Sequence, residues 1–421
     1  MKFKFIKKFT ILCLVLTSVL ILFSCLSDDE IINYNIEIVE TKAKETKAFS
    51  FERDNVIDNE KKIITKKDRD FMASENIKDL IKNRTRKPKE VRGVYLPAYV
   101  VGKAERFDPI FENIKNSSIN TIVVDVKDEI GRITFNMDAE VVKEFKTIEP
   151  QIKDIKSFID LCHENDIYVI ARVATFLDNF ATKKFSSLAI KTKKGKNYKD
   201  NTGYYWLNPY NEKVQDYILD IGKGCAKAGF DEVQYDYFRF SADSGMRNVV
   251  FNEEETKGKS KIEIITEIAQ RITQELIPLN IYVSIDVFGA IMNSYRDQNS
   301  IGQEYQTLLK YVDYLCPMLY PSHYANTTFG LKVPDKEPYE TILSAIKTSD
   351  TVIEKTFDSA SHYGKIRPWL QAFTANYLPD YITYDVKEYK EQIKAVEDAG
   401  LKEWLFWHPS GNYKWEAFID N

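Results

Sequence analysis

Two aspartates in this 421-residue sequence stand where carboxylates could do chemistry. Asp236 ends the segment 230–236, in which polar side chains alternate with apolar ones, and Asp286 lies near the end of a similar segment, 281–288. A period of two predicts a β-strand whose polar face is costly unless it meets water, a partner or a ligand. Two carboxylates held close together repel each other, which raises the pKa of one of them. One can then act as a nucleophile and the other as a general acid.

The elements that would position these aspartates repeat along the chain from residue 92 onward. Short runs of β-branched and aromatic residues alternate with amphipathic helical patterns. The strands are predicted over residues 92–97, 120–127, 167–173, 230–236, 281–288, 312–320, 366–373 and 402–408, and the clearest helices over 152–165, 211–227, 262–277 and 386–399. Gly229 reads as a helix stop. Such alternation implies parallel strands with right-handed crossovers, and eight units predict a (β/α)8 TIM barrel with long βα loop insertions. A doubly wound open sheet is the alternative, which we disfavour because no Gly-rich phosphate turn follows the first strand.

Polar side chains occur at the predicted carboxyl ends of these strands. In chain order they are Tyr95, Asp125, Lys127, Arg172, Asp236, Arg239, Asp286, Tyr320, Gln371 and His408. Active sites of such barrels form at this end, and so many converging polar groups are costly for stability alone. We therefore expect a ligand site there. For any single residue the alternative is a structural partner, such as an ion pair of Asp125 with Lys127 or Arg172.

The fourth and fifth strands should be neighbours in the barrel. Paired strands lie about 4.8 Å apart, so Asp236 and Asp286 are expected at roughly the 5–5.5 Å separation of retaining glycosidases. We assign Asp236 as nucleophile and Asp286 as acid/base. Asp125 is a reserve carboxylate, and an inverting reaction that uses Asp125 with Asp236 remains open.

Aromatic residues support a sugar ligand. Tyr204, Tyr205 and Trp206 lie in a long insertion after the third strand, and such insertions are usually functional or disordered. Trp206 offers a flat face to a sugar ring; the alternative is that it packs on the barrel rim. Trp404, Trp407 and Trp415 are expected in the core or the closing helix. The insertions 241–260 and 321–338 are further candidate walls of the site.

The first 25 residues have the pattern of a secretory signal peptide. Lysines precede an apolar run that is shorter than the roughly 20 residues needed to span a bilayer, and Cys25 after Leu22-Phe23-Ser24 resembles a bacterial lipobox. We expect lipidation of Cys25 and a protein anchored to a membrane of the bacterial cell envelope, outside the cytoplasm. Simple cleavage and an uncleaved anchor are the alternatives. Residues 26–89 read as a largely disordered polar linker, which leaves the barrel to residues 90–421.

Composition argues against several other classes of protein. The net charge of −4 disfavours nucleic-acid binding. The four histidines are not closely paired, so we expect no metal site, and no motif suggests a cofactor. Cys162, Cys225 and Cys316 lie in apolar surroundings and are expected to be buried without a disulfide framework. The oligomeric state is not predicted.

Four motifs carry a resemblance to a known family. Residues 92–96 (RGVYL), 124–128 (VDVKD), 206–210 (WLNPY) and above all 230–240 (FDEVQYDYFRF) resemble the glycosyl hydrolase domain family DUF4015, over roughly residues 91–415. The family motif usually reads Asp-Tyr-Ile-Arg-Phe-Pro, where this chain has Phe238 for Ile and Ser241 for Pro. The resemblance implies a barrel distantly similar to α-amylase-like and α-galactosidase-like enzymes.

That resemblance also implies roles for residues. The nucleophile of those relatives maps to Asp236, and the acid of the α-amylase-like group maps to Asp286, where relatives usually have Glu. Other relatives place the acid on the sixth strand, where this chain has Tyr320. An α-linked glycan is the implied substrate.

Three functional hypotheses follow. The leading one is a surface-tethered glycoside hydrolase without a cofactor. The second is a non-catalytic glycan-binding lipoprotein on a barrel scaffold, which should have lost one of the two aspartates, whereas both are present. The third is a structural or adhesion protein, which predicts no cluster of perturbed carboxylates. Metal-dependent deacetylation lacks the His and Asp spacing for a metal.

Overall fold

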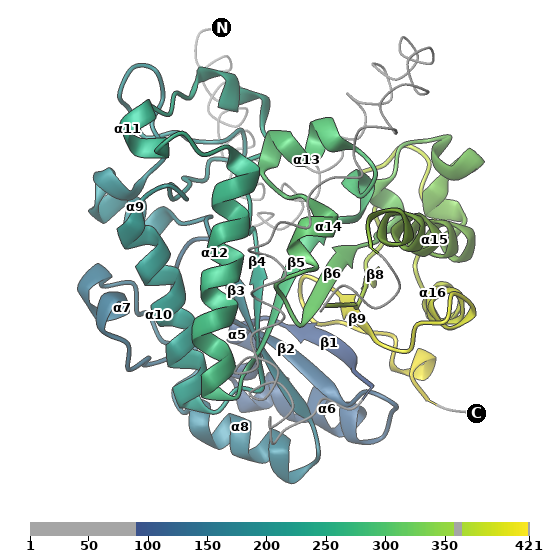
Figure 1. Cartoon of the computed structure of the whole chain (residues 1–421). Coiled ribbons are helices and arrows are strands. Elements are labelled where there is room, and N and C mark those ends of the chain that lie inside the picture. The colour runs from purple at the N-terminus through teal and green to yellow at the C-terminus, as the bar shows by residue number, and fades with distance from the viewer. Residues whose placement is uncertain (1–89, 358–363, 420–421) are drawn as a thin grey trace, which may run out of the picture.

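The computed structural model describes residues 90–357 and 364–419. The predicted signal peptide, Cys25 and the linker lie outside the described residues. Parallel strands form a central barrel, with helices wrapped around it (Figure 1). The strands are β1 (Arg92–Leu96), β2 (Thr121–Lys127), β3 (Tyr168–Ala174), β4 (Glu232–Asp236), β5 (Tyr282–Phe288), β6 (Tyr314–Met318), β7 (Lys365–Ile366), β8 (Trp369–Gln371) and β9 (Trp404–Trp407).

Pairing closes the sheet on itself. The order is β5-β4-β3-β2-β1-β9-β8-β6-β7, and an additional β5–β6 pairing joins the ends. The predicted seventh strand is present as two short pieces, β7 and β8, because Pro368 between them has no N–H for the ladder. Counting these pieces as one position gives the predicted eight-strand parallel barrel, so the TIM-barrel fold is confirmed.

Helices and loop insertions surround the strands. The helices are α5 (Ala98–Val101), α6 (Ala104–Lys115), α7 (Glu140–Phe145), α8 (Ile155–Glu164), α9 (Asn179–Lys184), α10 (Glu212–Ala228), α11 (Glu253–Thr256), α12 (Lys261–Leu276), α13 (Tyr295–Ile301), α14 (Tyr305–Leu308), α15 (Pro338–Thr356) and α16 (Val386–Asp398). α11 and α13, which follow β4 and β5, lie at the upper end of the barrel in Figure 1. That end carries the carboxyl ends of the strands. None of these helices is long and apolar enough to cross a membrane.

Local sequence signals explain where the long helices begin and end. Asn211 caps α10, and Gly229 ends it in a left-handed conformation with φ 102°, as predicted. Ser260 and Glu263 form a capping box at the start of α12. The glycine therefore sets where α10 ends and the chain continues into β4, and the capping box sets where α12 begins.

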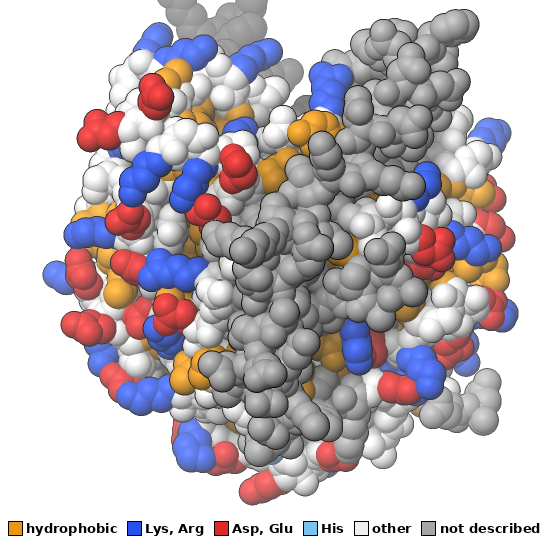
Figure 2. Space-filling view, in the orientation of Figure 1, with side chains coloured by type: hydrophobic (Ala, Val, Ile, Leu, Met, Phe, Trp, Pro, Cys, Tyr) orange, Lys and Arg blue, Asp and Glu red, His pale blue; other side chains and the backbone are white. Residues whose placement is uncertain are grey.

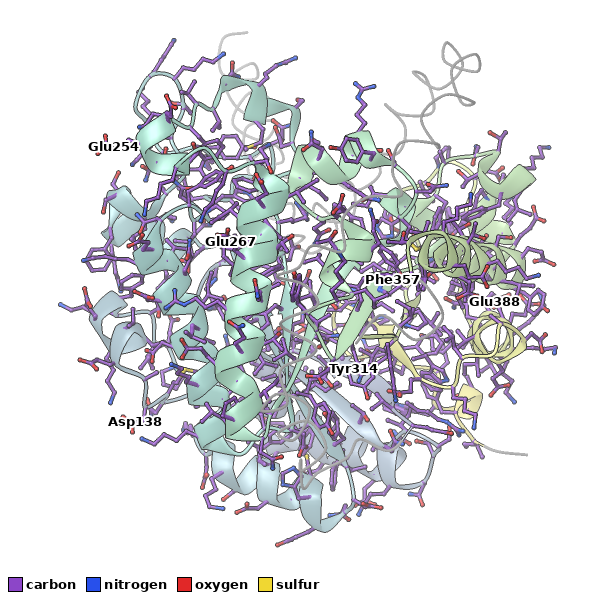
Figure 3. The ribbon with its side chains drawn as sticks, in the orientation of Figure 1. Asp138, Glu254, Glu267, Tyr314, Phe357 and Glu388 are labelled. Carbon is purple, nitrogen blue, oxygen red and sulfur yellow. The ribbon has the colours of Figure 1, made fainter. Side chains whose placement is uncertain are left out.

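The core consists of two apolar clusters. One lies between the strands and the helices, and the other fills the barrel interior with side chains such as Tyr95, Ile170, Tyr314 and Leu405. Tyr314 lies near the middle of the molecule in Figure 3, whereas Asp138 and Glu254 lie at its outer edge. Cys162, Cys225 and Cys316 are buried and free, in accordance with their apolar surroundings.

The polar face of β4 points into the barrel. Val233 and Tyr235 join the outer cluster, whereas the carboxylate of Glu232 accepts hydrogen bonds from Arg367 Nη1 at 2.8 and 3.1 Å. Both side chains are fully buried, and the guanidinium lies 3.5 Å from the centre of the Tyr314 ring. The inward-facing carboxylate at the amino end of β4 is thus neutralised by an ion pair.

Removing one partner of this pair should destabilise the fold strongly. Arg367→Met leaves the Glu232 charge buried and unpaired, which typically costs about 3–5 kcal/mol in the free energy of unfolding. Urea unfolding followed by circular dichroism measures the loss. The double variant Arg367→Met/Glu232→Gln should recover part of it, and a single-variant loss no larger than that of the exposed Lys156→Met would contradict the assignment.

Candidate active site

Asp236 stands at the carboxyl end of β4 among three N–H donors. Its Oδ2 accepts hydrogen bonds from Arg172 Nε at 3.1 Å and Nη2 at 2.6 Å, and its Oδ1 accepts one from the backbone N–H of Tyr237 at 2.6 Å. Tyr237 has φ 49°, a left-handed conformation that is uncommon for a residue with a side chain. The chain therefore turns sharply just after Asp236. The side chain of Asp236 keeps 12% of its surface accessible.

Asp286 on β5 is the more deeply buried of the two predicted aspartates. Only 2% of its surface is exposed, and its Oδ1 accepts a hydrogen bond from Trp369 Nε1 at 2.8 Å. Burial and the neighbouring charge of Asp236 raise the pKa of Asp286 well above its ordinary value, against the lowering effect of the Trp369 bond. These surroundings therefore favour the protonated form of Asp286 more than water would.

The two aspartates lie on adjacent strands and at the same level. β4 and β5 pair in parallel with Gln234 opposite Ser284 and Tyr235 opposite Ile285, so Asp236 and Asp286 continue that register. Paired strands are about 4.8 Å apart, which makes the two carboxyl groups neighbours on the inner face of the barrel. Their environments differ: one carboxylate receives a guanidinium, and the other receives only a neutral indole N–H.

Arg172 on β3 lies at the centre of the barrel mouth, by which we mean the end that carries the carboxyl ends of the strands. Its guanidinium donates to Asp125 Oδ1 at 2.6 Å, Glu129 Oε1 at 2.7 Å and Asp236 at 2.6 Å. It also lies over the ring of Tyr95, with 5.4 Å to the centroid, and over that of Trp407 at 4.7 Å. A single cation is thus shared among three carboxylates, which cannot all be ionised without leaving excess negative charge.

The pKa values of those carboxyl groups diverge accordingly. Burial and the charge of Glu129 raise the pKa of Asp125 to about 7, although Arg172 and the Tyr95 hydroxyl, 2.5 Å from Asp125 Oδ2, act in the opposite direction. For Glu129, burial is outweighed by Arg172, which holds the pKa of Glu129 below its ordinary value. Asp125 is therefore a second group that can carry a proton near neutral pH.

Other predicted site residues are committed to structural contacts. Lys127 is fully buried, with Nζ 3.1 Å from Asp178 Oδ2 and 2.5 Å from the carbonyl oxygen of Ala174. Gln371 is also fully buried and accepts hydrogen bonds from the backbone N–H and Oγ of Ser322. These contacts leave neither side chain accessible to a ligand, and they anchor loops around the mouth instead.

Trp206 and Arg239 pack together on the rim. Trp206 is 1% exposed and donates its indole N–H to Asp200, while the Arg239 guanidinium lies 5.2 Å from the Trp206 ring and 4.4 Å from the Phe288 ring. The packing alternative stated for Trp206 is therefore what the structure shows. Together these contacts tie the long insertion after β3 to the segments after β4 and β5.

Tyr320 and His408 lie after β6 and β9. Tyr320 is 7% exposed, and burial followed by the charges of Asp286 and Asp236 raises its pKa, so it stands beside the aspartate pair. His408 Nδ1 accepts hydrogen bonds from the backbone N–H groups of Ser410 and Asn412, and burial lowers the pKa of His408 to about 4. Tyr95, Asp125, Arg172, Asp236, Asp286 and Tyr320 thus form one connected group.

Three further residues contact this group and were not among the predicted site residues, although Glu129 comes directly after the second predicted strand. Glu129 and Trp369 bind Arg172 and Asp286 directly, and Trp407, expected in the core, stacks on Tyr95 at 4.0 Å between centroids. A signal for Trp407 was present, because Trp404 and Phe406 face the outer cluster and the alternate residue must face inward. Within residues 90–357 and 364–419, no group of three or more His, Cys, Asp or Glu side chains is placed to hold a metal ion.

Comparisons with known proteins bear on the family and on the fold. None of the curated proteins matches the chain. A hypothetical protein from Ruminiclostridium thermocellum is 31% identical over 46% of this chain and 97% of its own, with a TM-score of 0.42. The PgaB (BpsB) glycoside hydrolase domain from Bordetella bronchiseptica superposes with a TM-score of 0.55 at 11% identity, over 77% of this chain and 95% of that one. The model of the family DUF4015, described as "putative glycosyl hydrolase domain", matches residues 93–413, and the chain therefore belongs to this family.

Proposed function

We propose that the protein is a retaining glycoside hydrolase acting on an α-linked glycan, with Asp236 as nucleophile and Asp286 as general acid/base. One observation carries the proposal: two neighbouring carboxyl groups at the mouth have opposite surroundings. Divergent environments of this kind assign acid and base roles in glycosidases. Membership of a glycosyl hydrolase domain family supports the reaction class. The α linkage is supported by the resemblance to α-amylase-like and α-galactosidase-like enzymes.

The donors around Asp236 suit a nucleophile. Arg172 and the Tyr237 N–H stabilise its negative charge, yet Oδ1 accepts only one of these three hydrogen bonds and keeps a second lone pair, and part of the side chain is accessible. In the first step Asp236 attacks the anomeric carbon as the glycosidic C–O bond breaks, and Asp286 gives its proton to the departing oxygen. In the second step Asp286 takes a proton from water, which attacks the anomeric carbon and frees Asp236.

Two alternative functions are each supported by a specific observation. Asp125 also has a raised pKa and shares Arg172 with Asp236, so these two residues are the candidate pair for an inverting reaction. A non-catalytic glycan-binding barrel would keep Trp407 and Tyr95 as stacking surfaces without turnover. The stereochemistry of the product separates the first alternative from the retaining reaction, and turnover separates the second.

Removing the proposed nucleophile should abolish hydrolysis. We expect Asp236→Asn to lower kcat/KM on aryl α-glycosides and α-linked oligosaccharides by about 10³-fold or more, because the amide cannot form the glycosyl intermediate. The anomer released first by the wild-type enzyme is followed by NMR. Asp154→Asn is the matched control, since Asn caps α8 as well as Asp does. Undiminished turnover, or release of the inverted anomer, would contradict the assignment.

Replacing the proposed acid should depend on the leaving group. We expect Asp286→Asn to slow substrates with poor leaving groups by about 10²- to 10⁴-fold and activated aryl glycosides far less. Because the pKa of Asp286 is raised, the wild-type acid keeps its proton to a higher pH than an ordinary aspartate, and the rate should fall as pH rises through that pKa. The variant should lack this alkaline limb on activated substrates. Equal losses on both substrate types would argue against an acid role.

We also propose that the barrel is tethered to a membrane of the bacterial envelope through a lipid on Cys25. The basic and apolar pattern before this cysteine supports the proposal. Cys25→Ser should move the protein from the membrane fraction to the soluble fraction and remove labelling by radioactive palmitate. Unchanged partitioning without labelling of the wild type would indicate an uncleaved anchor.

A further inference from the structure

His323 ends the 3₁₀ turn Pro321–His323 that follows β6, and its two ring nitrogens have no assigned role. Both nitrogens are buried and neither has a hydrogen-bond partner among the described residues. Buried polar atoms are paired in most proteins, because an unpaired one loses its bond to water without replacement. An imidazole with two unpaired nitrogens therefore calls for a partner that residues 90–357 and 364–419 do not supply.

The segment that carries His323 is held firmly. The imidazole lies 5.1 Å from the Tyr320 ring and 6.1 Å from the Phe373 ring, measured between centroids. Ser322 donates its N–H and its Oγ hydrogen to Gln371 at 3.0 and 2.8 Å. Gly289 packs so closely that a β-carbon there would lie 2.5 Å from the carbonyl oxygen of Met318. The imidazole is therefore positioned by its surroundings and has little freedom to find a partner by moving.

The imidazole lies beside Tyr320 and carries no charge. Tyr320 belongs to the apolar cluster of the barrel interior, which also contains Trp369, the donor to Asp286 Oδ1. The charges of Asp286 and Asp236 contribute to the raised pKa of Tyr320. Burial lowers the pKa of His323 to about 3, so the ring is neutral in the ordinary pH range. A neutral imidazole presents one donor and one acceptor, the combination that a hydroxyl group matches.

The charges of the mouth indicate which sugars would fit. Arg172 is shared by three carboxylates, Lys127 is paired with Asp178, and the Arg239 guanidinium lies between the rings of Trp206 and Phe288. These three cations at the strand ends are thus already engaged. A carboxylate or sulfate on a sugar would meet excess negative charge here, whereas hydroxyl groups would not.

We propose that His323 is a substrate-binding residue that hydrogen-bonds a hydroxyl group of an uncharged sugar beside Asp286. This inference rests on the proposed glycosidase function and adds to it a specificity-determining contact and a substrate class. The aromatic contacts with Tyr320 and Phe373 keep the ring upright, and its two nitrogens supply the donor and the acceptor.

The test measures binding without requiring turnover. The full chain carrying Asp236→Asn is applied to an array of uncharged α-linked oligosaccharides and their uronic-acid and sulfated counterparts. The tightest uncharged oligosaccharide is then titrated against protein labelled with ¹⁵N-histidine. We expect a ring ¹⁵N shift at His323, assigned by its loss in His323→Gln, and about three- to tenfold weaker binding in His323→Phe, as one neutral hydrogen bond predicts.

Conservative variants and a matched control separate recognition from packing. His323→Phe keeps an aromatic ring against Tyr320 and Phe373. Gln or Asn at this position restores a polar group near Nε2 or Nδ1, so one of the two should recover affinity. His163→Gln, in contact with Asp231 at the opposite end of the barrel, should bind like the parent.

Three outcomes would overturn the inference. Unchanged affinity in His323→Phe, together with unmoved ring signals of His323, would overturn the proposed contact. If the wild-type protein still hydrolyses the oligosaccharides, the proposed function would stand. Preferred binding of anionic glycans would overturn the substrate class. Absence of both binding and hydrolysis across the array would overturn the inference together with the function on which it rests.

Discussion

The guanidinium of Arg172 is the interaction on which the mouth of this barrel depends. Carboxylates from β2, the loop after it and β4 converge on one side of the barrel, and only this cation is shared among Asp125, Glu129 and Asp236. A planar group with five donors can serve three acceptors in fixed directions, which the single ammonium of a lysine could not do. The guanidinium also lies over the rings of Tyr95 and Trp407, which adds cation–π contacts to the ion pairs. The positions and protonation states of the surrounding acids follow from this arrangement.

The inner face of β4 serves the fold at one end and the site at the other. Glu232 is neutralised by Arg367 deep in the barrel, and Asp236 is held by Arg172 at the mouth. Gln234 lies between them, fully buried, and its amide has no partner within the described residues. An ordered water is the usual solution for such a group. A polar strand interior is therefore tolerated because each end has its own cation.

On the molecular face drawn in Figure 2, basic and acidic side chains are interspersed, without a single-sign patch on its coloured part.

Local pattern was enough to predict the strands and several contacts. The period of two placed Asp236 and Asp286 on inward faces of neighbouring strands, and the stated alternative for Asp125, an ion pair with Arg172, is present. Prediction was weaker where the partner comes from elsewhere in the sequence. Lys127 lies near the end of a strand, where a ligand-binding residue would be expected. The pairing of β2 with β3 shifts register between Asp125 and Lys127, and the Lys127 side chain pairs with Asp178 instead.

The sequence by itself determined the alternating strand and helix units, the residues at the strand ends and the points where helices stop, because periodicity, caps and glycine conformations act over a few neighbouring residues. Only the tertiary structure decided which polar ends share a partner. Barrel closure brings Trp369 to Asp286 and Trp407 to Arg172 across long stretches of chain. Burial, which sets the contrasting environments of Asp236 and Asp286, exists only once those stretches have packed, since a pKa responds to the charges and solvent around a group and not to its place in the sequence.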